Sequence, residues 1–170
     1  NIRFKYNKYG KPYLVGIPEI SFNVSHSAYQ GLFAFALNNE IGIDLEKINP
    51  QIEVQKLATR FFSKEEAKII LALPSSEQAI HFFKCWTRKE AFIKGHGEGL
   101  SLPLDQFEVT ILEDDDVKLN KVSWNPEEAN FWNLVSFSLD KEMIGALAFR
   151  GSVSKIKFMT WEIQPVDLGN

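Results

Sequence analysis

Residues 22–46 read FNVSHSAYQGLFAFALNNEIGIDLE, and this stretch predicts three consecutive β-strands. Alternating side chains at residues 21–27 and 31–37 indicate the two arms of a hairpin. The turn formers Asn38 and Asn39 then lead into a third strand at residues 41–46. The chain is therefore expected to contain an antiparallel sheet.

Two carboxylates in the third strand are the first candidate site residues. Successive side chains of a strand point to opposite faces, so Asp44 and Glu46 share one face and Leu45 lies on the other. Two carboxylates on an exposed face are one interpretation. The strand is otherwise apolar, however, and a partly buried acidic pair needs a cation. Mg²⁺ suits such a pair, because it prefers hard oxygen ligands.

Three helices are predicted after these strands, at residues 52–60, 63–73 and about 75–94. Ser63 opens the motif SKEE, a capping box with Glu66 at the third helical position. The glycine-rich run GHGEG that follows the third helix is expected to end it. This run is not a dinucleotide fingerprint, since it follows a helix and not a strand.

The third helix contains CWTRKEAFIK at residues 85–94. Trp86, Glu90 and Lys94 are four residues apart and share one face. Glu90 and Lys94 could form an ordinary surface ion pair, and Cys85 is interpreted as a core residue. If the helix instead faces Asp44 and Glu46, three carboxylates and a lysine meet. That arrangement suits a magnesium ion on a pyrophosphate, and hence a phosphoryl-type transfer.

Other charged residues allow two interpretations each. His26, between two serines, is either a hydrogen-bonded structural residue or a contact to a phosphate or hydroxyl group. A basic N-terminal stretch ending at Lys11 is either a solvated edge or the site of a terminal phosphate. The run Asp114, Asp115 and Asp116 is interpreted as a solvated turn and not as a metal site.

The second half of the chain returns to strands, predicted at residues 107–112, 121–124, 133–139 and 144–149. Its last hairpin can be aligned, with gaps, to the first: both have an aromatic-Asn start, a Ser-containing strand and a small apolar strand with Ala-Phe. The predicted fold class is α+β, with two similar halves related by a pseudo-twofold axis. Each half is an antiparallel sheet packed with helices, and the groove between them is a natural ligand site.

The boundary between the two halves is placed at residues 48 and 49. Residues 1–48 are expected to be the remainder of an N-terminal half that is incomplete at its N-terminus. Residues 49–170 are expected to form the C-terminal half, which carries the helix with Glu90. Two internal halves make a monomer sufficient.

Composition excludes several classes of protein. The 170 residues are 45% hydrophobic with a formal net charge of −3, so a general nucleic-acid binder is not expected. The sequence has no long apolar run for a membrane span and no signal-peptide core. A single cysteine fits a reducing compartment. The expected location is cytoplasmic.

Together, the motifs resemble the 4′-phosphopantetheinyl transferases of the Sfp type. They are GKPY at 10–13, NVSHS at 23–27, GIDLE at 42–46, RFFSKEE at 60–66, WTRKEAFIK at 86–94 and GLSLPLDQFEV at 99–109. The resemblance implies transfer of 4′-phosphopantetheine from coenzyme A to a serine of an apo acyl or peptidyl carrier protein, with release of 3′,5′-ADP. Coenzyme A is then a substrate, and the metal is Mg²⁺, or Mn²⁺ with the same oxygen ligands.

The resemblance also assigns roles to single residues. Asp44, Glu46 and Glu90 are implied metal ligands, and Glu90, directly or through a water, is the implied base for the serine. Lys94 is implied to contact the phosphates and stabilise the leaving group. The implied coenzyme A contacts are His26 and Lys11 at the 3′-phosphate, Ser25 near the adenine end, and Lys89 at a phosphate.

The chain departs from the Sfp type in one respect: the first segment of such enzymes, with further phosphate-binding cations, has no counterpart here. Two other functions therefore stay open. One is a catalytically inactive module that binds carrier proteins. The other is a magnesium-dependent pyrophosphate hydrolase that acts on coenzyme A with the same carboxylates.

Overall fold

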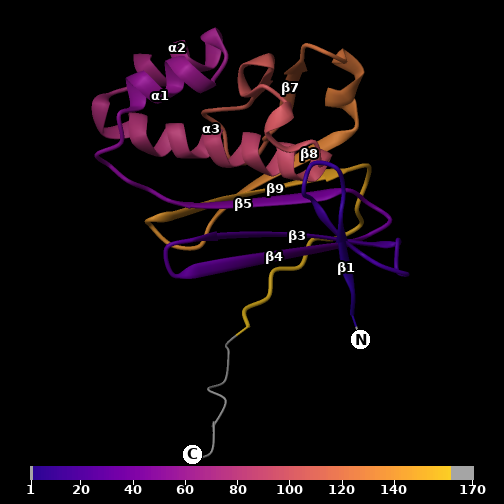
Figure 1. Cartoon of the computed structure of the whole chain (residues 1–170). Helices are drawn as coiled ribbons and strands as arrows, with labels where there is room; N and C mark the ends of the chain where they lie inside the picture. The colour runs from indigo at the N-terminus through magenta and orange to yellow at the C-terminus, as the bar shows by residue number, and fades with distance from the viewer. Residues whose placement is uncertain (1, 162–170) are drawn as a thin grey trace, which may run out of the picture.

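A three-stranded antiparallel sheet of order β5–β9–β8 organises the fold (Figure 1). Its strands are β5 (Ile41–Lys47), β9 (Met143–Arg150) and β8 (Trp132–Ser138). The register pairs Asp44 with Ala146 across β5 and β9. The computed structural model describes residues 2–161. Because β5 comes early and β8 and β9 late, the sheet joins distant parts of the sequence.

The predicted hairpin is formed by β3 (Ile20–Ser27) and β4 (Gln30–Leu37), which pair antiparallel along their whole lengths. A two-residue turn follows Ser27, with Ala28 in the left-handed region at φ 52°. Figure 1 shows the hairpin beyond β5, on the side away from the helices. One hairpin face packs on the sheet through Ala34, whereas the other is apolar and exposed at Phe33, Phe35 and Leu37.

Two further hairpins are small. The strands β1 (Phe4–Tyr6) and β2 (Pro12–Leu14) form the first, which the sequence pattern did not predict. The second is β6 (Phe107–Val109) with β7 (Leu119–Val122). The predicted strand at 107–112 is too long, because the chain leaves β6 after Val109 and enters a loop. The strand predicted at 121–124 begins two residues earlier.

The three predicted helices are present: α1 (Val54–Phe61), α2 (Lys64–Ala72) and α3 (Ser75–His96). They lie on the side of the sheet opposite the β3–β4 hairpin, and α3 is the helix that packs on the sheet (Figure 1). The capping box is confirmed, because Ser63 and Glu66 each accept a hydrogen bond from the other's backbone N–H. Within residues 2–161, no helix combines the length and the apolar character needed to span a bilayer.

The end of α3 differs from the prediction. Gly95 lies inside the helix, and the left-handed residue that closes it is Gly97, at φ 84°. Gly95 is required for close packing instead: an added Cβ would lie 2.6 Å from the Trp132 ring. The helix therefore continues two residues past Lys94 while it rests on the sheet.

The larger core cluster surrounds α3, which packs on the sheet on one side and on α1, α2 and β6 on the others. Under the helix, β9 presents the fully buried Ala146 and Ala148. The smaller cluster on the other face of the sheet contains Ile41, Ile43 and Leu147 and is covered by the β3–β4 hairpin. The sheet is thus buried on both faces, and its β5 strand lies between hairpin and helix.

Two residues of the aspartate run at 114–116 form ion pairs. Asp114 binds Lys84 and Arg88 of α3, and Asp116 binds Lys118. Asp114 is thus more than the solvated turn residue that was predicted, because it joins the β6–β7 loop, residues 110–118, to α3. Cys85 is fully buried, as predicted, and burial raises the pKa of its thiol.

Candidate active site

The site lies where β3 runs beside β5 without backbone–backbone hydrogen bonds between the two strands. This contact is called the β3–β5 seam. Three alternate side chains of β3 serve as hydrogen-bond acceptors for β5 instead. Asn23 Oδ1, Ser25 Oγ and Ser27 Oγ accept from the N–H groups of Ile43 (2.9 Å), Leu45 (3.2 Å) and Lys47 (3.0 Å), respectively. The residue numbers increase together, so the two strands run parallel. The NVSHS motif is therefore the part of β3 that satisfies an otherwise unpaired strand edge.

The same serines hold the acidic pair. Ser25 Oγ donates to Asp44 Oδ1 at 3.0 Å, and Ser27 Oγ donates to Glu46 Oε2 at 3.2 Å. Asp44 is buried and Glu46 is half-buried. The predicted common face of the two carboxylates is consistent with these matched contacts. Ser27 was not among the predicted site residues, although its alternation with Ser25 was a visible signal.

Helix α3 approaches β5 so closely that backbone touches backbone. A Cβ added to Gly42 would lie 2.1 Å from the Ala91 carbonyl oxygen and 2.2 Å from the Gly95 nitrogen. A glycine within a strand often marks such a close approach. The contact brings the C-terminal half of α3 over the acidic residues. Lys94 Nζ consequently lies 2.7 Å from Asp44 Oδ1 and 3.1 Å from Ser25 Oγ.

Glu90 is the third carboxylate of this region. Burial raises its pKa to about 7, and the charges of Asp44 and Glu46 act in the same direction, while Lys94 opposes them. The pKa of Asp44 is also raised by burial, although Lys94 and Ser25 lower it. For Glu46, burial and the charge of Asp44 raise the pKa. Three carboxylates therefore repel one another in a poorly hydrated place.

One atom of the cluster lacks a partner. Asp44 Oδ2 is buried and accepts no hydrogen bond, which is costly for a carboxylate oxygen. Within residues 2–161, no three His, Cys, Asp or Glu side chains are arranged to hold a metal ion as they stand. Lys94 is the cation that contacts Asp44 in this arrangement. The orphaned oxygen and the mutual repulsion of the carboxylates nevertheless fit a divalent cation with oxygen ligands.

The structure contradicts the predicted role of Lys89. Its side chain is fully buried, and Nζ binds Glu66 Oε2 at 2.8 Å and the carbonyl oxygens of Leu104 (2.7 Å) and Phe107. Glu66 also accepts from Val109 N–H at 2.9 Å. Lys89 therefore joins α3 to α2 and to the segment that leads into β6, and no donor remains for a phosphate.

Lys11 and His26 are not brought together. Lys11 Nζ donates to the carbonyl oxygens of Gly95 (2.6 Å) and Ile41 (3.3 Å), near the start of β5, and burial lowers its pKa. It lines a pocket of about 540 Å³ beside the β1–β2 hairpin. His26 is exposed near the other end of β3, on the strand face opposite Ser25. Of the predicted coenzyme A contacts, only Ser25 and Lys94 lie at the acidic cluster.

Comparison with known proteins places these residues in a family. Residues 40–148 match the model of the 4′-phosphopantetheinyl transferase superfamily, and they include Asp44, Glu46, Glu90 and Lys94. The chain is 44% identical over 120 residues to the 4′-phosphopantetheinyl transferase Sfp of Bacillus subtilis, covering 70% of this chain and 52% of Sfp. It thus spans about half the length of that relative.

Two other relatives give the same result. The chain is 32% identical over 160 residues to the 4′-phosphopantetheinyl transferase HetI of Nostoc sp., covering 92% of this chain and 64% of HetI. It is 34% identical over 92 residues to AcpT of Escherichia coli O157:H7, covering 54% and 47% of the two chains. The family match extends over more than half of the sequence and confirms the predicted resemblance. The chain belongs to the 4′-phosphopantetheinyl transferase superfamily.

Proposed function

We propose that this chain carries the metal site of an enzyme that transfers 4′-phosphopantetheine from coenzyme A to a serine of an apo acyl or peptidyl carrier protein. The observation that carries the proposal is the cluster at the β3–β5–α3 seam. Three carboxylates with raised pKa values, one lysine and an orphaned buried oxygen converge there. Family membership supports the choice of reaction among those that such a cluster can perform.

The metal ligands in this proposal are Asp44, Glu46 and Glu90, and the ion is Mg²⁺ or Mn²⁺. A divalent ion would neutralise the pyrophosphate of coenzyme A and the charge that develops on the leaving group. Asp44 would contribute the oxygen that now has no partner. Ligation would also offset the burial and the repulsion that raise the pKa of Glu90.

The transfer needs one bond to form and one to break. The serine oxygen attacks the β-phosphorus, the bond to the oxygen bridging the two phosphates breaks, and 3′,5′-ADP leaves. Glu90 would take the serine proton, directly or through a water. Lys94 would turn from Asp44 toward the phosphates and stabilise the leaving oxygen.

Three further contacts to coenzyme A belong to the proposal. Ser25 would lie near the adenine end, and His26 and Lys11 would meet the 3′-phosphate. The exposure of His26 leaves it accessible to a ligand. Lys11 would have to exchange its two carbonyl partners for the phosphate, which is feasible because a lysine side chain is long and flexible. Lys89 is excluded, because its ammonium group is buried and fully engaged.

We further propose that the fold represents two similar halves related by a pseudo-twofold axis, with the site in the groove between them. The similarity of the β3–β4 and β8–β9 hairpins supports this, because both are antiparallel. The β3–β4 hairpin packs beside β5, whereas β8 and β9 belong to the same sheet as β5. Division at residues 48 and 49 remains a prediction. Strand β5 precedes that boundary but completes the sheet of the following part. A monomer in the cytoplasm also remains a prediction.

The decisive experiment is incubation of the chain with coenzyme A, Mg²⁺ and an apo carrier protein, followed by intact mass spectrometry of the carrier. The proposal predicts a mass increase of one phosphopantetheine group and equimolar 3′,5′-ADP. Release of 4′-phosphopantetheine without modification of the carrier would identify a hydrolase instead. Carrier binding without either product would identify an inactive binding module.

A further inference from the structure

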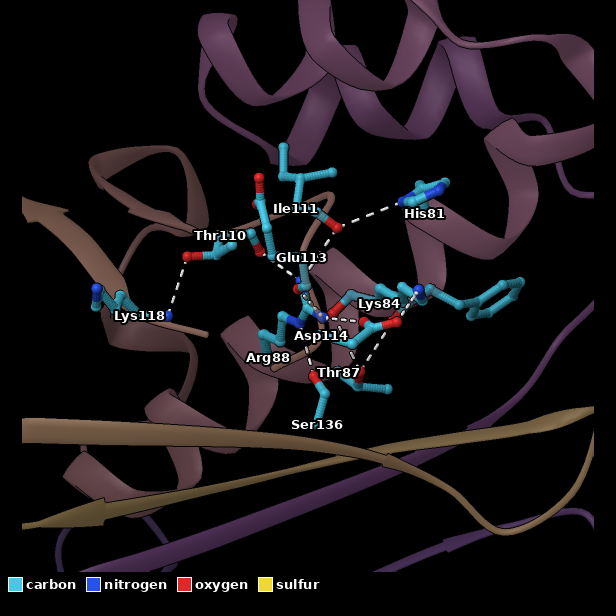
Figure 2. A network of polar contacts seen from close by, with 11 residues as sticks. His81, Lys84, Thr87, Arg88, Thr110, Ile111, Glu113, Asp114, Lys118 and Ser136 are labelled. Atoms are coloured by element: carbon cyan, nitrogen blue, oxygen red, sulfur yellow. Dashed lines mark hydrogen bonds and ion pairs between the residues drawn. The ribbon is translucent and has the colours of Figure 1, made fainter. Parts of the chain in front are cut away.

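Arg88 is the most extensively bound side chain on the flank of α3 away from β5. Its Nε donates to Ser136 Oγ of β8 at 2.7 Å. Nη1 donates to the carbonyl oxygens of Thr110 (2.7 Å) and Ile111 (3.1 Å). Nη2 donates to the Glu113 carbonyl (3.0 Å) and to Asp114 Oδ1 (2.7 Å). Figure 2 shows this guanidinium group between β8 and the β6–β7 loop.

The surface on which α3 rests does not by itself define the rotation of the helix. Thr87, Ala91 and Gly95 follow one another at four-residue spacing and are buried against the sheet. Below them lie glycine and alanine residues of β5 and β9, including Gly42 and Ala146. Contact between small residues allows close approach, but it offers few interlocking side chains that would resist rotation about the helix axis.

Polar side chains on the two flanks of this stripe add directional contacts, beside the Lys89 anchor on the far face of the helix and the packing of Phe92 on Trp132. At about 100° per residue, Lys94 lies about 60° to one side of Ala91 and Arg88 about 60° to the other. Glu90 is on the Lys94 side. Lys94 reaches Asp44 of β5, whereas Arg88 reaches Ser136 of β8. A rotation that lifts one flank from the sheet lowers the other.

The Arg88 flank is the more firmly held of the two. Arg88 is fully buried and joins three segments of the chain, while the Lys94 side chain is 30% exposed and has one ionic partner. Lys84, one turn earlier, adds a second contact to Asp114 at 2.5 Å. Loss of Arg88 would leave several loop carbonyl groups without a donor and would free the helix to turn.

We propose that Arg88 is a positioning residue: by anchoring α3 to β8 and the β6–β7 loop, it holds Glu90 and Lys94 over Asp44 and Glu46. The inference rests on the proposed function only where Mg²⁺ affinity is measured. The measurement of stability is independent of the proposed function. The guanidinium group of Arg88 binds β8 and the β6–β7 loop and not the acidic residues, so it would act through the rotation of α3.

The test uses the Arg88→Met substitution, which keeps the apolar stem and removes every donor. Calorimetric titration of Mg²⁺ in the presence of coenzyme A is expected to show affinity about tenfold weaker than in the unmodified chain, a typical effect for groups that orient metal ligands. The matched control is Ile70→Ala, in the core at α2, where Ile70 is fully buried. It is expected to lower stability but to leave the Mg²⁺ affinity of the folded protein within about twofold.

A double-mutant cycle of Asp44→Asn and Lys94→Met, read out by urea unfolding, gives the structural measurement. In the unmodified chain, the effects of the two substitutions on the free energy of unfolding are expected to be non-additive, that is, coupled, because Asp44 and Lys94 form an ion pair. In the R88M background they are expected to be additive. Ser136→Ala, which removes one contact only, should weaken the coupling in the same direction if R88M does not fold. The proposal is wrong if R88M keeps both the coupling and the Mg²⁺ affinity of the unmodified chain. If R88M does not fold, the same result in S136A would overturn it. An equal loss of Mg²⁺ affinity in I70A would also overturn it.

The two proposals fail differently. If the unmodified chain binds no Mg²⁺, the proposed function is wrong, and the coupling cycle alone decides the role of Arg88. If it binds Mg²⁺ and modifies the carrier protein, but R88M behaves like the unmodified chain, only the positioning role is wrong.

Discussion

Lys94 Nζ lies 2.7 Å from Asp44 Oδ1, and this ion pair joins α3 to β5 at the seam where three carboxylates gather. One lysine does not balance Asp44, Glu46 and Glu90, and the second oxygen of Asp44 stays without a partner. Lys94 therefore supplies only part of the positive charge that the three carboxylates require.

Asp44→Asn tests the most central carboxylate. The side chain keeps its shape but loses its charge, so transfer to the carrier protein is expected to fall about a hundredfold or more. Thermal stability should not fall, because burial already disfavours the charged form of Asp44. Steady-state rates and a melting curve check both expectations. A rate near that of the unmodified chain would remove Asp44 from the metal site.

The raised pKa of Glu90 predicts how the stability of the chain depends on pH. Its pKa in the folded chain is about 7 and its ordinary value is 4.5, so the group favours folding below about pH 4.5, where it is protonated in both states. This contribution is lost as the pH rises through 7, at a cost on the order of 2 kcal/mol. In chelator, urea unfolding should therefore show lower stability at pH 8 than at pH 5.

The Glu90→Gln variant separates this effect from other titrations. The substituted side chain stays uncharged, so the stability of this variant is expected to fall less between pH 5 and pH 8. Asp44 and Glu46, whose pKa values are also raised, account for the smaller fall that remains. Mg²⁺ should restore stability at pH 8 in the unmodified chain only. The same pH dependence in both proteins would show that burial and the neighbouring carboxylates do not raise the pKa of Glu90.

Gly42→Ala tests the close contact of helix and strand. The added Cβ would lie 2.1 Å from the Ala91 carbonyl oxygen, so α3 must move away from β5. We expect a loss of stability of about 1–3 kcal/mol and a lower transfer rate in the protein that remains folded. Gly31→Ala in β4 is the control, because its Cβ would meet no atom closer than 3.8 Å. Equal behaviour of the two variants would contradict the packing argument.

Lys89→Met tests whether Lys89 stabilises the core through Glu66 or binds a phosphate of coenzyme A. Removal of the ammonium group leaves Glu66 buried without its charge partner, for which a loss of about 3–5 kcal/mol is expected. Glu66→Gln in the same chain should recover part of that loss. Coenzyme A affinity of the folded fraction should be unchanged. Unaltered stability together with weaker coenzyme A binding would restore Lys89 as a ligand contact.

Much of the fold was predictable because its patterns are local. The alternation in residues 22–46 determines which faces Asp44 and Leu45 occupy, and Ser63 with Glu66 marks the start of α2. The β1–β2 hairpin was missed because its strands are three residues long and largely exposed, and so lack a clear alternation. Gly95 was assigned to the end of α3, but its contacts with Trp132 and Gly42 arise only in the folded sheet.

The site was predicted less completely for a related reason. Lys89 and Glu90 are neighbours in one charged motif, yet a helix directs adjacent side chains about 100° apart. One points to the acidic seam and the other into the core between α2 and β6. Which charged residue is buried depends on partners far away in sequence, such as Glu66 for Lys89 and Ser136 for Arg88.

The most direct test of the account is calorimetric titration of Mg²⁺ into the chain with coenzyme A present, comparing the unmodified protein with Glu90→Gln. The control is Glu53→Gln, at an exposed carboxylate of the α1 region. The account predicts one divalent site in the unmodified and E53Q proteins, and affinity at least about tenfold weaker in E90Q. Equal Mg²⁺ affinity in all three proteins would show that α3 and β5 do not share a metal ion.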